Sequence, residues 1–166
     1  LLEAGFAPHA IASACADGTI RRVRRGWYVD GEQWRSLWSE SRHLVLVIAA
    51  ARDAKEAFTA SHLSAAVLHG LPLYRVAPAR VHVTAGARDR RSAPGMFRHE
   101  GPLPDSDVTV VDGIRCTTVE RTLFDIARTA STEVALVCAD AAASAAGGGP
   151  RAFDERAATE VIDPLR

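Results

Sequence analysis

Four arginines occur within the five positions 21–25, between a short helical segment and the aromatic pair Trp27 and Tyr28. The runs 19–22 and 26–29 have the composition of two short strands joined by a tight turn. A helix followed by a basic hairpin is typical of winged helix-turn-helix units, whose hairpin, or wing, presents cations to nucleic-acid phosphates. The cluster therefore predicts a winged helix at the beginning of the chain and makes DNA binding the first functional hypothesis.

The distribution of charge along the chain agrees with this hypothesis. The 166 residues include 20 Lys and Arg and 20 Asp and Glu, so the formal net charge is zero. Residues 1–99 nevertheless contain 14 basic and 8 acidic residues, a net charge of +6, whereas residues 100–166 contain 6 and 12, a net charge of −6. We therefore expect the first part of the chain to contact an acidic partner.

Cysteine usage and hydropathy indicate a cytoplasmic protein. The three cysteines, Cys15, Cys116 and Cys138, are odd in number and lack the spacing of metal ligands, so reduced thiols are expected. The longest apolar run, Leu44 to Ala51, is too short to cross a bilayer, and no membrane partner is expected.

The order of the elements predicts an α+β fold with an N-terminal winged helix-turn-helix, a small mixed α/β domain and C-terminal helices. We expect the winged unit at 1–32, with its first helix truncated because the sequence begins within a helical segment. Apolar residues at three- and four-residue steps predict a connector helix within 33–56. The α/β domain is expected at 57–146, followed by a C-terminal tail at 147–166 from which a further domain would continue.

Local signals place the strands of the α/β domain. Period-two alternation predicts a strand at 80–85, and a weaker one is expected at 96–99. The runs 107–111 and 114–117 flank Asp112-Gly113, a pair typical of a two-residue hairpin turn.

Two helices of this domain have recognisable first residues. Ser61 is expected to cap a helix that ends near Leu68. Thr117 and Glu120 have the spacing of a capping box, which predicts that a helix begins there. Arg121 and Asp125 are four residues apart on this helix, so an ion pair is expected at its surface or between packed elements.

The candidate DNA contacts lie on the wing and on the helix before it. The predicted wing contacts, to phosphates or the minor groove, are Arg21, Arg22, Arg24, Arg25 and Tyr28. His9 and Ser13 are the candidates for base readout, because the rest of the helix is mostly alanine and cannot make bidentate hydrogen bonds. A homodimer would compensate by doubling the contacts across two half-sites. The alternative is that the arginines form a solvated strand edge that prevents pairing with other chains.

A second basic patch is expected in the loop 86–95, which carries Arg88, Arg90 and Arg91. This loop is either a flexible, solvated segment or a second contact for DNA or for an acidic partner.

No catalytic residue, metal ligand or cofactor site is predicted. Ser61 and His62 suggest a nucleophile and a base, but the sequence shows no orienting carboxylate or oxyanion site. His69 adds no clearer pattern. His82 and His99 on adjacent strands suggest a metal pair, but no third ligand has suitable spacing. We therefore expect a protein that is not an enzyme.

Several sequence blocks resemble the AbiEi-type antitoxins of type IV bacterial toxin–antitoxin systems. The resemblance covers roughly residues 1–140 and depends on the order and spacing of its blocks. These are Gly18 and the wing Arg-Val-Arg-Arg-Gly-Trp-Tyr at 22–28, the segment Ala-Ser-His-Leu-Ser-Ala-Ala-Val-Leu-His-Gly-Leu-Pro at 60–72, residues 107–113, Thr117, and Glu-Arg-Thr-Leu-Phe-Asp at 120–125.

The resemblance implies an N-terminal winged helix that binds inverted repeats of double-stranded DNA in its own promoter, and a following domain needed for antitoxin action. Such antitoxins oppose a nucleotidyltransferase-like toxin and repress their own transcription. This sequence departs from many relatives because its recognition helix lacks basic residues.

Two other functions remain open from the sequence. Many related proteins carry a further nuclease-like domain, for which this chain would be the DNA-targeting portion. The chain would instead be a protein-interaction module if its basic face bound an acidic protein.

Overall fold

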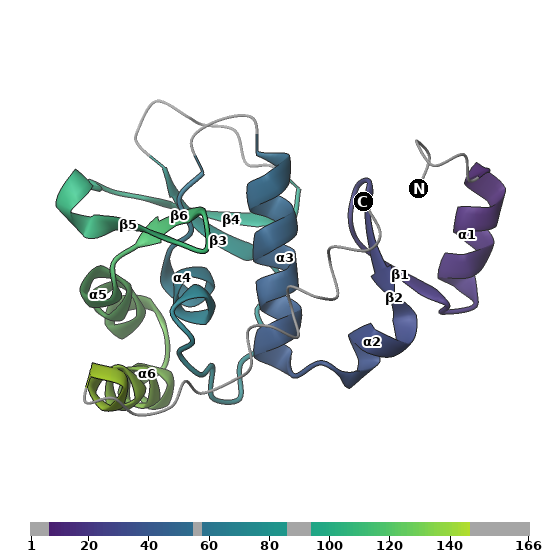
Figure 1. Ribbon diagram of the computed structural model, residues 1–166. Helices are drawn as coiled ribbons and strands as arrows, with labels where there is room; N and C mark the ends of the chain where they lie inside the picture. Colours follow the sequence, from purple (N-terminus) through teal and green to yellow (C-terminus); the bar gives the residue numbers. More distant parts are fainter. Residues whose placement is uncertain (1–6, 55–57, 86–93, 147–166) are drawn as a thin grey trace.

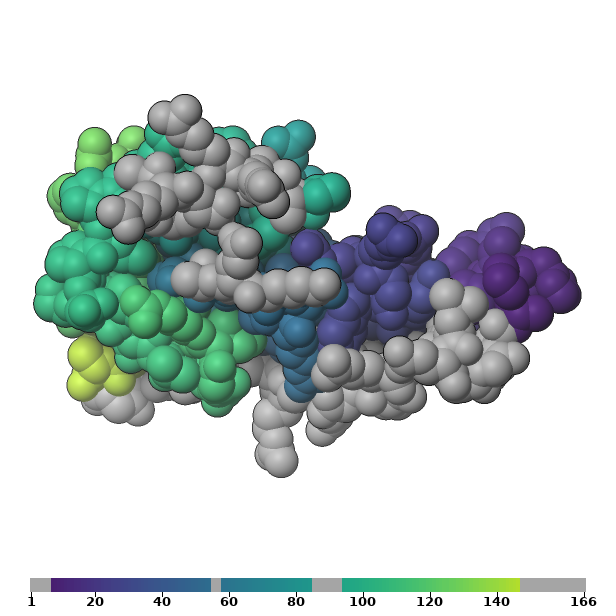
Figure 2. All heavy atoms as spheres, turned by 90° about the horizontal axis from the view of Figure 1, so that it is seen from above, coloured from purple at the N-terminus to yellow at the C-terminus, as the bar shows by residue number. Residues whose placement is uncertain are grey.

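The computed structural model describes residues 7–54, 58–85 and 94–146 (Figure 1). Helices and small sheets are both present, so the predicted α+β class is confirmed. A small N-terminal unit lies on one side of the long helix α3, and the remaining strands and helices lie on the other (Figure 1). In the space-filling view this unit projects from the rest of the molecule (Figure 2). Within the three described ranges, no helix has the length and apolarity needed to cross a membrane.

The N-terminal unit has the element order expected of a shortened winged helix. It consists of α1 (Pro8–Ala16), β1 (Ile20–Arg24), β2 (Trp27–Asp30) and α2 (Gly31–Ser36). Strands β1 and β2 pair antiparallel around a turn in which Gly26 has a φ of 81°, and the register shifts between Arg22 and Arg24. Such a bulge bends and twists the hairpin. The unit is compatible with a winged helix.

The turn after α1 is fixed to the start of α2. The carboxylate of Asp17 accepts hydrogen bonds from the backbone N–H of Thr19 at 2.9 Å and from its hydroxyl at 2.6 Å. The backbone N–H of Gly31 donates to the Thr19 carbonyl at 2.8 Å. A Cβ at Gly31 would overlap the carbonyl oxygen of Gly18, so this close approach requires glycine. These contacts hold α1 in a fixed orientation relative to the hairpin.

The single connector helix expected within 33–56 is interrupted. Helix α2 ends at Ser36, α3 runs over Ser39–Asp53, and both residues between them are extended, with ψ angles of 145° and 163°. Arg42 stabilises the break because its guanidinium donates to the carbonyls of Trp34 at 2.9 Å and Arg35 at 2.8 Å. These carbonyls lie at the end of α2, where an intrahelical partner is missing.

The second part of the molecule contains one mixed sheet and several helices. Its remaining elements are α4 (His62–Leu68), β3 (Val81–Ala85), β4 (Met96–Glu100), the 3-10 turn η1 (Asp105–Asp107), β5 (Val108–Val111), β6 (Ile114–Thr117), α5 (Val119–Thr129) and α6 (Thr132–Ala146). Strands β3 and β4 are parallel, whereas β5 and β6 are antiparallel. Ala60 joins the two pairs through bridges to Val83 and Cys116. The hairpin turn predicted from Asp112-Gly113 is present, and both residues have positive φ.

The hydrophobic core extends from the wing into the second part. Val29 on β2 is fully buried and Trp27 is nearly so, and both belong to the same buried cluster as Leu44 and Val47 of α3. Helix α3 therefore carries the hairpin on one side and the second part of the molecule on the other (Figure 1). This shared core fixes the place of the wing.

The capping hydrogen bonds of helices α4 and α5 differ from those predicted. Ser61 occupies the cap position of α4, but its hydroxyl makes no capping hydrogen bond and instead lies 3.0 Å from His62 Nδ1. Helix α5 is capped by Thr118, whose hydroxyl accepts from the backbone N–H of Arg121 at 3.3 Å. The cap thus lies one residue after Thr117, so Glu120 does not occupy the capping-box position. The Thr117 hydroxyl is used elsewhere, in a hydrogen bond with Thr122 at 2.7 Å.

Candidate nucleic-acid interface

The wing presents three of its four arginines to solvent. Arg21 and Arg22 on β1 and Arg25 in the turn are exposed. Their guanidinium groups are planar cations with several N–H donors, which suits contacts with phosphate oxygens. The fold therefore forms the cationic hairpin that the sequence predicts, while DNA contact itself stays a prediction.

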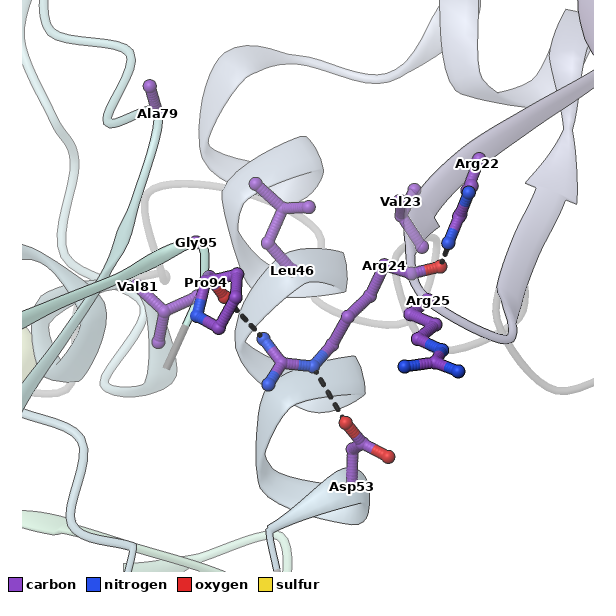
Figure 3. A pocket seen from close by; sticks show the side chains of 10 residues that line it. All are labelled: Arg22, Val23, Arg24, Arg25, Leu46, Asp53, Ala79, Val81, Pro94 and Gly95. Atoms are coloured by element: carbon purple, nitrogen blue, oxygen red, sulfur yellow. Dashed lines mark hydrogen bonds and ion pairs between the residues drawn. The ribbon is translucent and has the colours of Figure 1, made fainter. Parts of the chain in front are cut away.

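Arg24 has a different environment. Its side chain is 18% exposed, and its Nε donates to the Asp53 carboxylate at 2.9 Å (Figure 3). A terminal nitrogen of Arg24 also donates to the carbonyl of Pro94 at 3.3 Å. Arg24 thus ties the wing to the end of α3 and to the segment before β4. The exposed Arg22 makes a hydrogen bond within the wing, from its Nε to the Arg24 carbonyl at 3.4 Å, whereas Arg24 bonds to other elements of the molecule.

The candidate recognition helix, α1, lies beside the hairpin and presents few polar groups. His9 and Ser13 are exposed, whereas Ile11 is the buried residue of this helix. The first turn contains no acidic residue and the last turn contains no basic residue. An exposed face with one imidazole, one hydroxyl and several alanines supports few directional contacts with bases.

The two aromatic residues of the wing have different positions. Trp27 is 7% exposed and belongs to the core, so it anchors the hairpin. Tyr28 is half-buried and lies opposite Arg22 in the strand pairing. Tyr28 therefore retains partial access to solvent next to an exposed cation.

The predicted second basic patch, with Arg88, Arg90 and Arg91, lies outside the described residues. Among the arginines near it in sequence, Arg75 stacks over the ring of Tyr74 with 5.0 Å between its guanidinium carbon and the ring centroid. Arg80 is exposed just before β3.

Away from the wing, the expected ion pair between Arg121 and Asp125 is present and extends to further partners. Arg121 Nε donates to both carboxylate oxygens of Asp125 at 3.0 and 3.1 Å. Nη1 of Arg121 donates to Asp107 at 2.7 Å and to the Pro102 carbonyl at 3.1 Å. Asp125 is 5% exposed, so the arginine neutralises a buried carboxylate and joins α5 to η1. These hydrogen bonds raise the pKa of Arg121 above its usual value.

Asp125 also faces a cluster of three histidines, His62, His82 and His99. The carboxylate lies 3.9 Å from His62 Nδ1, and the His62 ring stacks on the His99 ring with 3.4 Å between centroids. His99 Nε2 lies 3.0 Å from His82 Nδ1, within hydrogen-bonding distance. His62 has a φ of 51°, an uncommon value for a residue with a side chain. The sequence suggests the pairs Ser61–His62 and His82–His99 only separately, and the fold joins them into one cluster.

The histidine cluster is neutral at physiological pH. Burial and the neighbouring histidines lower the pKa of His62 to about 3 and that of His82 to about 4. The pKa of His99 is also lowered by burial, although Asp125 opposes this shift. A neutral pair is consistent with the contact between His82 and His99, because one ring nitrogen must donate and the other accept.

His43 extends the buried network toward α3. Its Nδ1 lies 3.1 Å from the Pro78 carbonyl, and its Nε2 lies 2.8 Å from the Ser64 hydroxyl. The Ser64 hydroxyl also accepts from the backbone N–H of His82 at 2.8 Å. Burial lowers the pKa of His43 to about 4, and His82 adds to the effect. These side chains therefore form a satisfied polar network inside the second part.

The geometry does not match a catalytic triad or a metal centre. Ser61 Oγ and Asp125 both approach Nδ1 of His62, whereas a triad uses the two ring nitrogens for different partners. Ser61 is also fully buried. Within the described ranges, no group of three His, Cys, Asp or Glu side chains has the arrangement needed to hold a metal ion.

Comparison with known protein families matches residues 59–156 to the AbiEi antitoxin C-terminal domain. The chain belongs to the AbiEi-type antitoxin family. No curated protein matches the chain.

The AbiEi match begins at the buried bridge beside Ala60 and includes the histidine cluster and the Arg121 ion pairs. It supports assignment of the chain as an antitoxin of a toxin–antitoxin system. The wing lies before the matched residues. A role for the wing is therefore argued from its own geometry and not from the family match.

Proposed function

We propose that this AbiEi-type antitoxin binds double-stranded DNA through its N-terminal hairpin and represses its own operon. The observation that carries the proposal is the exposure of Arg21, Arg22 and Arg25 on one hairpin beside α1. Three exposed cations on a rigidly mounted wing can neutralise phosphates and release their counterions.

In this proposal the wing and helix α1 make different kinds of contact with DNA. The wing supplies affinity through phosphate or minor-groove contacts, which carry little sequence information. His9 and Ser13 on α1 supply the base contacts, and a homodimer doubles them across an inverted repeat. Because α1 offers so few polar groups, binding of a single copy depends mainly on the wing.

The experiment measures the affinity for a duplex taken from upstream of the protein's own reading frame, as a function of salt. For the double variant R22A/R25A, we expect the slope of log affinity against log salt to fall by about one unit for each phosphate that is no longer neutralised. The matched control is Arg128→Ala, an exposed arginine on α5 whose guanidinium stacks on Phe124. It should leave both affinity and slope unchanged.

An unchanged slope and affinity in the double variant would refute the wing as the DNA-binding element. If the unaltered chain retards no duplex even at low salt, its basic face would instead fit an acidic protein partner.

Family membership supports a second part of the proposal, namely that the chain opposes a nucleotidyltransferase-like toxin encoded beside it. Co-expression with the adjacent gene should restore growth that the adjacent gene alone prevents. A reporter driven by the shared promoter should be repressed by the unaltered chain and released in R22A/R25A.

A further inference from the structure

A cavity of about 540 Å³ lies between the wing and the second part of the molecule (Figure 3). Arg22, Arg24 and Arg25 reach it from the hairpin, whereas Leu46 and Asp53 reach it from α3. The segment from Pro94 to Gly95 and the start of β3 form the opposite wall. This volume lies in the range of pockets that hold small organic ligands.

The lining carries an excess of positive charge. Among the residues that the structure describes, it contains three arginines and one carboxylate, that of Asp53, which gives these residues a formal charge of +2. Asp53 is already paired with Arg24, but its side chain is 46% exposed. A phosphate monoester carries close to two negative charges at neutral pH, which matches this excess.

Arg24 is placed to bind such a group. Its two hydrogen bonds, to Asp53 and to the Pro94 carbonyl, use two of the five N–H donors of the guanidinium. The remaining donors can bind phosphate oxygens in the paired geometry that arginine favours. The Asp53 carboxylate is thus an internal anion that competes for Arg24 with an external one.

The other side chains that the structure describes in the lining are apolar. Val23, Leu46 and Val81 contribute aliphatic side chains next to the arginines. A bare phosphate ion would leave this surface uncovered, whereas an ester with a compact apolar body would bury it. One part of the cavity lining is therefore cationic and another part is hydrophobic.

We propose that this cavity binds a small phosphate monoester with an apolar body, held by Arg24 and flanked by Arg22 and Arg25. The ligand would bridge the wing and the second part of the molecule. Arg22 and Arg25 are also proposed to contact DNA, so an occupied cavity would compete with the duplex. This last consequence rests on the proposed function, but binding to the cavity does not.

The test uses isothermal titration of the full chain, without DNA, with phenyl phosphate as the probe. We expect a dissociation constant on the order of a millimolar or tighter, as suits a ligand of this size. Phenyl sulfate has one negative charge fewer, and inorganic phosphate lacks the apolar body. Each should bind about tenfold more weakly, which is the size of one missing charged or hydrophobic interaction.

Three variants assign the binding to this cavity. Arg24→Gln should weaken phenyl phosphate binding by about tenfold or more, since it removes a charged hydrogen-bond donor. Asp53→Asn should tighten binding, because it removes the competing anion while changing only a half-exposed side chain. Arg21→Gln is the matched control on the same strand, and it lies outside the cavity lining. It should leave the affinity unchanged.

The inference is wrong if phenyl phosphate and inorganic phosphate bind equally, since only a surface phosphate site would then exist. It is also wrong if no binding is detected, if Asp53→Asn weakens binding, or if Arg21→Gln weakens it as much as Arg24→Gln. A chain that binds the duplex but not the probe would retain the proposed function and lose this inference. A chain that binds the probe but not the duplex would retain this inference and lose the proposed function.

Discussion

The wing and the histidine cluster use charged and polar side chains in opposite ways. Arg21, Arg22 and Arg25 are exposed on a hairpin, so folding removes little water from them and the desolvation free energy is small. The network of Arg121, Asp125 and the three histidines is largely enclosed, and each member has a partner within the molecule. The exposed charges are thus available for binding, whereas the enclosed ones stabilise the part of the chain that matches the antitoxin domain.

The largest expected effect comes from removing the cation of the enclosed network. Arg121→Met leaves the carboxylate of Asp125 buried without its main partner, because the histidines of the neighbouring cluster are neutral. We expect the free energy of unfolding to fall by about 3–5 kcal/mol. Chemical denaturation measures this loss.

Arg128→Met is the control on the same helix, because Arg128 is exposed and interacts with Phe124 at the surface. It should change stability by less than about 1 kcal/mol. If both variants lost the same free energy of unfolding, the enclosed arginine would stabilise the fold no more than the exposed one, and the prediction would be wrong.

The second prediction concerns the pH dependence of stability. An unfolded histidine has a pKa near 6.5, but in the fold the pKa of His82 is lowered to about 4. Between these values the unfolded chain binds a proton that the folded chain does not, so stability falls as the pH falls. Each such histidine contributes up to about 1.4 kcal/mol per pH unit.

His82→Gln should therefore reduce the slope of stability against pH between about pH 6.5 and 5. Denaturation curves at several pH values give this slope. The control is His9→Gln on the exposed face of α1, which should leave it unchanged. A slope that persists in full after His82→Gln would show that the cluster does not carry the pH dependence.

Local sequence signals account for most of the elements. The strand pair with Asp112-Gly113, the strands β3 and β4 and the helices α4 and α5 follow from turn residues, helix caps and periodicity. The ion pair of Arg121 and Asp125 follows from helical spacing alone. The helix break after Ser36 was not predictable in this way, because apolar residues keep a helical period across it. The break depends on Arg42, which reaches back to the carbonyls of α2.

The histidine cluster could not be predicted for a different reason. His62 begins a helix, while His82 and His99 lie on two strands whose parallel pairing has no local signature. Only the tertiary fold brings their rings together. The pairing of Arg24 with Asp53 likewise joins residues 29 positions apart in the chain. The predicted DNA-binding residues and the domain boundaries stay predictions.

A smaller effect is expected from the tie between the wing and α3. Arg24→Met removes a partly exposed ion pair and a hydrogen bond to a carbonyl, so it should lower the free energy of unfolding by about 1 kcal/mol. Hydrogen exchange of the amides in β1 and β2 should accelerate more than that in β5 and β6. Arg21→Met on the same strand should change neither. Uniform acceleration across both hairpins would show that Arg24 does not anchor the wing specifically.

The smallest expected effect lies on α1. Ser13→Ala removes one exposed hydroxyl, whose hydrogen bond with a base would contribute about 0.5–1 kcal/mol. Affinity for the duplex should therefore fall only severalfold, and the salt slope should stay constant because every phosphate remains neutralised as before. Mobility-shift titrations with matched and base-substituted duplexes measure this, since the loss should vanish on a duplex already altered at the contacted base. An equal loss on every duplex would mean that Ser13 binds the backbone, and α1 would then resemble the wing in contributing affinity without sequence discrimination.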